Sequence, residues 1–190
     1  MNLLRLSGGG CASNPAVVCL GFFDGVHIGH QRLICSARDI AQERTLTLCV
    51  HTFDRMPARV LAPREAPAEL TSFARKARLL SAMGVDLLAV SRFEEAVTLA
   101  PATFFKEILL GRLRACHLVA GYHHRFGHGG KGDVTLLRTL CERAGIGLMV
   151  IDPVTLPDGE LVSSTAIRQA LAMGDSQRAA RMLGRTADPE

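Results

Sequence analysis

Two histidines, His27 and His30, stand three residues apart in the stretch GFFDGVHIGH. The apolar run of residues 16–20 precedes this stretch and has the pattern of a buried strand. Residues 31–44 carry apolar side chains at helical spacing, so a glycine-rich turn joins the strand to a helix and both histidines lie in its first turn. Free N–H groups and the helix dipole favour an anion there, and phosphate is the ligand that we expect.

Two other interpretations of this stretch remain open at this point. It can be a plain strand-to-helix turn whose polar residues cap the helix, and its glycines do not follow the Walker spacing or end in Lys-Ser/Thr. Zinc is less favoured, because two histidines are too few for a structural site and the chain has no CxxC pair. The sequence therefore identifies no residue as a metal ligand.

A second candidate anion site is the stretch SSTAIR, from Ser163 to Arg168. It follows a hairpin expected to turn at Asp158-Gly159 and begins a helix expected over 166–173. Hydroxyl groups, free N–H groups and an arginine one turn into the helix suit phosphate, although plain N-capping with a solvated arginine explains the same residues.

The elements that must position these motifs alternate along the chain. Strands are expected over 16–20, 45–51, 86–90, 117–120 and 146–151, and helices over 31–44, 71–83, 101–114, 133–144 and 166–173. This order predicts an α/β fold, with a Rossmann-like five-stranded parallel sheet, helices on both faces and further C-terminal helices. Ligands bind beyond the carboxyl ends of such strands, which is where both motifs fall.

Composition narrows the class of protein. The 190 residues are 48% hydrophobic, which fits one globular domain, 1–190, and no apolar run approaches the roughly 20 residues of a membrane span. The six cysteines show no pairing pattern and are interpreted as core thiols, so we expect a cytoplasmic protein. The net charge of +4 is carried without a long basic run, and the chain has one tyrosine and no tryptophan, so neither nucleic acid nor a membrane is an expected partner.

ATP spanning both helix starts would explain the two motifs together. Attack on its α-phosphorus by another phosphate needs positioning and charge neutralisation rather than a strong base. His27 and His30 would donate hydrogen bonds to the phosphates, and Arg168 would grip the β and γ groups. Magnesium would be bound chiefly by the phosphates themselves.

Five stretches in order, GFFDGVHIGH, HTFDRMP, LTSFARKARLLSAMGVD, AGYHHRFGHGGKGD and VSSTAIRQALAMGDSQRAARMLGR, give the chain a family resemblance. They resemble the adenylyltransferase module of the bacterial bifunctional riboflavin kinase/FAD synthetase family, within the HxGH nucleotidylyltransferase superfamily. The resemblance covers nearly the whole chain and implies AMP transfer from ATP to FMN, giving FAD and pyrophosphate. It implies Mg²⁺ with ATP, FMN as substrate, and a separate riboflavin kinase as a candidate partner.

The resemblance also implies roles for particular residues. ATP phosphates would contact His27, His30, Ser163, Ser164, Thr165 and Arg168. The nucleotide pocket would be shaped by Gly21, Phe22 and Asp24, and the flavin or the reacting phosphates would lie near Phe53, His123, Phe126 and Gly127. Core packing is an equally good explanation of the phenylalanines.

Three departures from the family pattern concern the acceptor. His123-His124 stands where an aspartate or asparagine followed by phenylalanine is usual, and Asp54-Arg55-Met56-Pro57 stands where Asp-Pro-His-Pro is common. Members of the family usually continue into a riboflavin kinase domain, and we expect none in this chain. Two alternatives to an FMN adenylyltransferase therefore stay open, namely a nucleotidylyltransferase for another phosphorylated acceptor and a catalytically weak nucleotide-binding protein. The histidine pair is also compatible with a mobile, solvated loop, or with a phosphate ligand that gains charge near pH 6.5.

Overall fold

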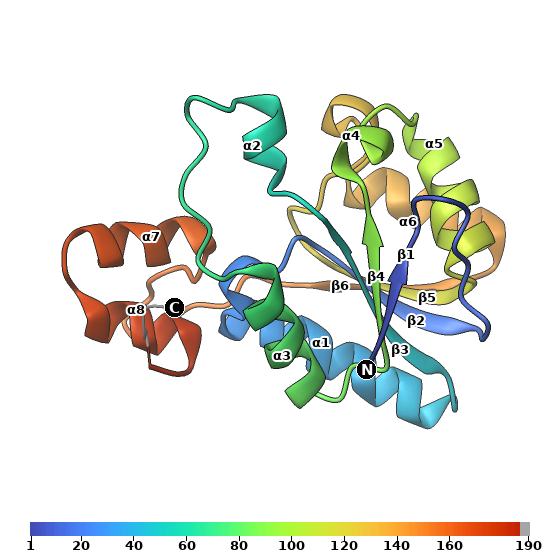
Figure 1. The fold of residues 1–190 in the computed structure, drawn as a ribbon. Helices are drawn as coiled ribbons and strands as arrows, with labels where there is room; N and C mark the ends of the chain where they lie inside the picture. Colours follow the sequence, from blue (N-terminus) through green and yellow to red (C-terminus); the bar gives the residue numbers. More distant parts are fainter. Residues whose placement is uncertain (187–190) are drawn as a thin grey trace.

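The computed structural model, which describes residues 1–186, is built on one parallel sheet (Figure 1). Its six strands are β1 (Asn2–Arg5), β2 (Ala16–Leu20), β3 (Thr47–Phe53), β4 (Leu87–Ser91), β5 (Ala115–Gly121) and β6 (Gly147–Ile151). They lie in the order β1-β4-β3-β2-β5-β6, and every pairing is parallel. The order reverses between β2 and β5, as in a Rossmann-like sheet. The α/β prediction is confirmed, with six strands rather than five.

The strand that the sequence missed is β1, at the edge of the sheet. It pairs with β4 from Asn2 opposite Leu87 to Arg5 opposite Val90. Its residues are mostly exposed, so they form neither the continuous buried run nor the regular alternation by which strands are recognised. A short, exposed edge strand carries little sequence signal.

The helices that cover and extend the sheet are α1 (Ile28–Glu43), α2 (Pro57–Leu61), α3 (Phe73–Ala82), α4 (Phe93–Ala96), α5 (Pro101–Thr103), α6 (Val134–Ala144), α7 (Ser164–Ala172) and α8 (Ser176–Leu183). Short 3₁₀ turns occur at η1 (Asp24–Val26) and η3 (His128–Gly130). The helix expected over 101–114 is present as the short α5 followed by a π-helix, η2 (Phe104–Arg112). Apolar residues three and four apart predict one buried helical face, but they do not specify which backbone hydrogen bond repeats.

The sheet is buried on both faces. Val18 and Leu20 of β2 pack in one core cluster with side chains from η2 and α6. Val17 and Cys19 point to the other face and pack with α1 and α3. This alternation explains why β2 is apolar throughout, and it confirms the prediction of helices on both faces.

A third, smaller cluster holds α7 and α8 beyond the sheet (Figure 1). Leu156 and Val162 pack in it with residues of both helices and with Ile28 of α1. The expected hairpin is present, with Thr155 opposite Leu161 in an antiparallel bridge. The C-terminal helices are therefore docked beside the start of α1, which carries the first motif.

Two further sequence inferences concern the burial of the cysteines and membrane-spanning segments. All six cysteines are free, but only Cys19, Cys49 and Cys141 are buried, so the core interpretation was wrong for Cys11, which is exposed, and incomplete for Cys35 and Cys116. No helix formed by residues 1–186 is both long and apolar enough to cross a membrane.

Candidate active site

Asp24 connects the two motifs that the sequence singled out. Its buried carboxylate accepts hydrogen bonds from the backbone N–H groups of Leu70, at 2.9 Å, and Thr71, at 3.2 Å. The same carboxylate forms an ion pair with Arg168, and the Asp24 carbonyl accepts a hydrogen bond from Ser164 Oγ at 3.0 Å. The two candidate anion sites therefore meet at one residue.

The two histidines lie in direct contact at the start of α1. His27 is the N-cap residue, its Nδ1 accepts a hydrogen bond from the His30 N–H at 3.3 Å, and the two rings stack at 3.6 Å. Burial, with smaller contributions from His123 and Arg185, lowers the pKa of His27 to about 4, and burial also lowers the pKa of His30. Since His27 is neutral at pH 7 and its Nδ1 accepts, its proton lies on Nε2, where it can be donated.

The second motif begins α7. Ser163 is the N-cap residue and accepts a hydrogen bond from the Ala166 N–H at 3.1 Å, so the capping interpretation is correct for this side chain. Arg168 is not a solvated arginine: besides its ion pair with Asp24, its Nε donates to the Ala68 carbonyl at 2.7 Å. Thr165 is exposed on the surface of α7.

A cavity of about 600 Å³ opens at the carboxyl ends of β2, β3 and β5. It therefore lies at the reversal in strand order, where ligands of such sheets bind. The predicted site residues that line it are Gly21, Phe22, Asp24, His30, Phe53, His123, Phe126, Gly127, Ser164 and Arg168. Three predicted residues are not in its lining: His27 lies against His30, Ser163 caps α7, and Thr165 faces outward.

Most of the remaining wall is apolar, and of it only Met56, Pro57 and His124 had been connected with the acceptor from the sequence. It is made by Met56, Pro57, Leu61, Pro67, Phe93 and Phe104, with His124 and Arg125 from the loop after β5. Phe53 contacts Phe93 edge-on at 5.2 Å between ring centroids, and Phe104 lies 6.0 Å from Phe126. The phenylalanines thus pack on one another and face the cavity, so the two interpretations of them are compatible.

A buried lysine supports the cavity floor. Lys76 Nζ donates to the Phe22 carbonyl at 2.8 Å and lies 3.6 Å from the centre of the Phe22 ring. Burial lowers its pKa to about 8, against the opposing effect of Asp24 and Glu69. No sequence signal indicates this role, because a lysine within a helix is normally solvated.

Two further histidines lie deep in the site. His51 Nε2 is 2.8 Å from Ser91 Oγ, and burial lowers the pKa of His51 to about 3. His124 stacks beside Phe126, its Nε2 is buried without a hydrogen-bond partner, and burial lowers its pKa to about 4. The expectation that the histidine pair gains charge near pH 6.5 is therefore wrong for His124.

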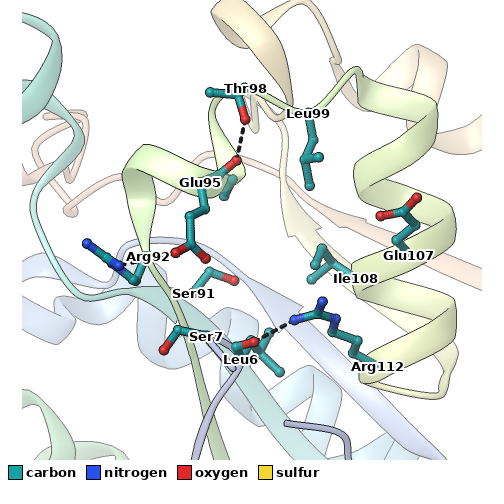
Figure 2. A pocket seen from close by; sticks show the side chains of 11 residues that line it. Leu6, Ser7, Ser91, Arg92, Glu95, Thr98, Leu99, Glu107, Ile108 and Arg112 are labelled. Atoms are coloured by element: carbon teal, nitrogen blue, oxygen red, sulfur yellow. Dashed lines mark hydrogen bonds and ion pairs between the residues drawn. The ribbon is translucent and has the colours of Figure 1, made fainter. Parts of the chain in front are cut away.

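A smaller pocket of about 270 Å³ lies beside the cavity, between the end of β1, α4 and η2 (Figure 2). Arg112 donates there to the Leu6 carbonyl, and Thr98 Oγ donates to the Glu95 carbonyl at 2.8 Å. None of the predicted site residues lines this pocket. Within residues 1–186, no group of three or more histidine, cysteine or acidic side chains is arranged to hold a metal ion.

Comparisons with known proteins point to one family. A family model described as FAD synthetase matches residues 11–166. The bifunctional riboflavin kinase/FMN adenylyltransferase of Bacillus subtilis is 37% identical over 172 residues, which cover 89% of this chain and 53% of that protein. The Escherichia coli K12 protein of the same description is 36% identical over 88% of this chain and 54% of its own length. The chain thus spans about half the length of these curated relatives.

Solved structures agree on the fold. A crystal structure described as a macrolide-efflux protein from Streptococcus pneumoniae superposes with a TM-score of 0.84 at 27% identity, over 97% of this chain and 60% of that one. Pantoate-beta-alanine ligase from Francisella tularensis superposes with a TM-score of 0.54 at 16% identity, over 86% of this chain and 69% of that one, and shows a shared fold alone. With the family model matching most of its residues, the chain belongs to the FAD synthetase family.

Proposed function

We propose that this chain is an FMN adenylyltransferase, which transfers AMP from ATP to FMN and releases pyrophosphate. The observation that carries the proposal is the junction at Asp24, where the starts of α1 and α7 meet at the rim of an aromatic cavity. Two helix starts suit a polyphosphate, and an apolar, phenylalanine-lined cavity suits a flat aromatic ring system.

The chemistry follows from that arrangement. A phosphate oxygen of FMN attacks the α-phosphorus of ATP, a new P–O bond forms, and the bond to pyrophosphate breaks. The neutral His27 and His30 supply hydrogen-bond donors without adding charge of their own, and the N–H groups at the two helix starts stabilise the developing negative charge. Arg168 lines the cavity while bound to Asp24, so it fixes the geometry of the two motifs and presents its charge to the phosphates at the same time.

Mg²⁺ is part of the substrate in this proposal, carried by the ATP phosphates. The flavin would occupy the part of the cavity near Phe53, Phe104 and Phe126. We place the reaction in the cytoplasm, since all six cysteines are free thiols, and we expect FMN to come from a riboflavin kinase activity, which the names of the relatives pair with FMN adenylyltransferase.

The direct test is incubation of the protein with ATP, Mg²⁺ and FMN, with FAD and pyrophosphate measured together. We expect equal amounts of the two products. Binding of ATP without either product would contradict the proposal and leave a nucleotide-binding protein.

A second candidate is adenylyl transfer to a different phosphorylated acceptor. The observation that favours it is the cavity wall on the acceptor side, where His123 and His124 stand in place of the usual family residues and Arg125 adds a positive charge. Pyrophosphate released with another phosphorylated acceptor, but not with FMN, would support this candidate.

A further inference from the structure

The turn of residues 22–26, which precedes His27, is held in place by hydrogen bonds to its backbone carbonyl groups. From Phe22 to Val26, every carbonyl accepts a hydrogen bond, and the carbonyls of Phe22, Asp24, Gly25 and Val26 have donors from distant parts of the chain. The Phe22 carbonyl accepts from Thr52 and Lys76, that of Phe23 from the Val26 N–H, that of Asp24 from Ser164, that of Gly25 from Arg185, and that of Val26 from Gln31 and Arg185. Arg185 is the donor that holds two of these carbonyls.

The turn needs such support because its backbone is strained. Phe23 has a φ of 58°, Gly25 of 78° and Val26 of 40°. A β-branched residue in this left-handed region is an outlier, and it persists only where its surroundings hold it. Val26 is also buried, so the turn cannot relax without exposing an apolar side chain.

Arg185 reaches the turn because the end of α8 lies against the start of α1. Gly184 ends α8 with a φ of 67°, and a Cβ added to it would lie 2.8 Å from the Ile28 side chain. Gln31 donates to the carbonyl of Leu183 at 2.9 Å, as well as to that of Val26. The half-buried guanidinium of Arg185 then bonds the Gly25 carbonyl at 2.6 Å and the Val26 carbonyl at 3.3 Å.

We propose that Arg185 is a positioning residue for adenylyl transfer, which clamps the strained turn and so places His27 and His30 toward the phosphates. It lies outside residues 11–166, the part of the chain that matches the family model. Its predicted effect on catalysis rests on the proposed function, whereas its effect on the turn does not.

The charge of Arg185 has a second effect on the same histidine. It helps to lower the pKa of His27, after burial and alongside His123. The other groups that face this pair are His30, stacked on His27, and Lys76, which helps to lower the pKa of His30. Removing Arg185 should therefore raise the pKa of His27, because one repulsive positive charge is gone and the turn can admit water.

The test uses Arg185→Met and Arg185→Lys in the full chain, with Arg181→Met as the matched control. Arg181 also lies near the end of α8, but it is exposed and pairs with Asp158. We expect Arg185→Met to lower kcat for FAD formation by about 100-fold, the scale of an ångström-sized misplacement, with a smaller change in the KM for FMN. In the unliganded Arg185→Met protein, NMR titration should show a higher pKa of His27 than in the wild type.

Arg185→Lys separates charge from geometry, because an ammonium keeps the charge but loses the two-pronged donor. It should keep the wild-type titration of His27 and still lower kcat, whereas Arg181→Met should change neither. Wild-type kcat together with wild-type His27 titration in a folded Arg185→Met protein would overturn the inference, as would equal effects of Arg185→Met and Arg181→Met. If Arg185→Met does not fold, Arg185→Lys with wild-type kcat would overturn it. Absence of FAD formation in the wild type would contradict the proposed function alone, since the titration would still test the clamp.

Discussion

At the scale of single residues, Arg168 has a structural role besides any contact with phosphate, because it forms an ion pair with Asp24. The sequence assigned Arg168 to the β and γ phosphates, but the structure engages it with Asp24, whose buried carboxylate needs a cation. We expect Arg168→Ala to lower the free energy of unfolding by about 3 kcal/mol, because it leaves that carboxylate unpaired.

The double variant Asp24→Asn with Arg168→Ala should recover part of this loss, because the unpaired charge is then absent. Denaturant unfolding of the two single variants and the double variant measures the coupling. Additive losses would show that the ion pair does not stabilise the junction.

His30 should affect turnover more than stability. Its ring lies in the cavity wall and its Nδ1 is buried without a hydrogen-bond partner. Removing the ring therefore breaks no hydrogen bond of Nδ1 in the unliganded protein. We expect His30→Ala to lower turnover by about 30- to 1,000-fold, equivalent to roughly 2 to 4 kcal/mol of transition-state stabilisation. His128→Ala is the control, since His128 is exposed and outside the cavity lining; a similar loss of turnover in both variants would refute the role of His30.

His123 is the residue that can decide the acceptor. It lines the cavity and is close enough to lower the pKa of both His27 and His30, whereas the partly buried His124 stays neutral. We expect His123→Asp to raise FMN turnover if the histidine has shifted specificity away from flavin. Rapid FAD formation by the wild type, with no gain in His123→Asp, would rule out the shift.

At the scale of elements, the loop after β5 is shaped by one close approach. Gly127 has a φ of 71°, and a Cβ added to it would lie 2.7 Å from the backbone of Pro101. Gly145, which ends α6, has a similar φ of 67° but open space around it. Replacing each by alanine therefore separates backbone strain from a steric clash.

We expect Gly145→Ala to cost about 1 kcal/mol of stability, the strain of a left-handed alanine. Gly127→Ala should cost at least 1 kcal/mol more, because α5 or the loop must also move. It should weaken binding in the cavity as well, since Gly127 lies in its wall. Thermal unfolding of both variants makes the comparison, and equal losses would mean that the loop absorbs the clash.

The sequence predicted elements well where local signals were complete. α3 begins after Ser72 and α6 ends at Gly145, because a hydroxyl cap and a left-handed glycine are local signals. The short α2 and α4 were not predicted, and neither was the π-type of η2, because these features depend on what the segments pack against. Most of the cavity wall was missed for the same reason, since Leu61 and Phe104 look like any other apolar residues until the chain is folded.

At the scale of the whole molecule, the order of alternating strands and helices was sufficient to predict the parallel sheet and the edge of the sheet at which the motifs meet. It was not sufficient to predict which groups the charged side chains contact. Nothing near Asp24 in the sequence indicates its ion pair with Arg168, and nothing near Gly25 indicates its hydrogen bond from Arg185. Arg168 lies in α7 and Arg185 two residues after the end of α8, and the docking of these helices depends on the packing of a separate apolar cluster.

The fold also buries histidines, and this predicts how the molecule responds to acid. Burial lowers the pKa of His27 and His124 to about 4 and that of His51 to about 3, from the ordinary value of 6.5. Below pH 6.5 the unfolded chain therefore binds protons that the folded protein does not bind. The free energy of unfolding should fall as the pH drops from 6.5 toward 4, by up to about 1.4 kcal/mol per pH unit for each such histidine.

His124→Phe tests this directly, because an aromatic ring is kept beside Phe126 while the titrating group is removed. Urea unfolding at pH 7, 6 and 5 should show a shallower loss of stability in this variant than in the wild type. His128→Phe should keep the wild-type slope, since His128 is exposed. The window above pH 5 matters, because carboxylates take up most of their protons below it and would mask the histidines. Identical slopes in all three proteins would mean that His124 is open to water in the folded state.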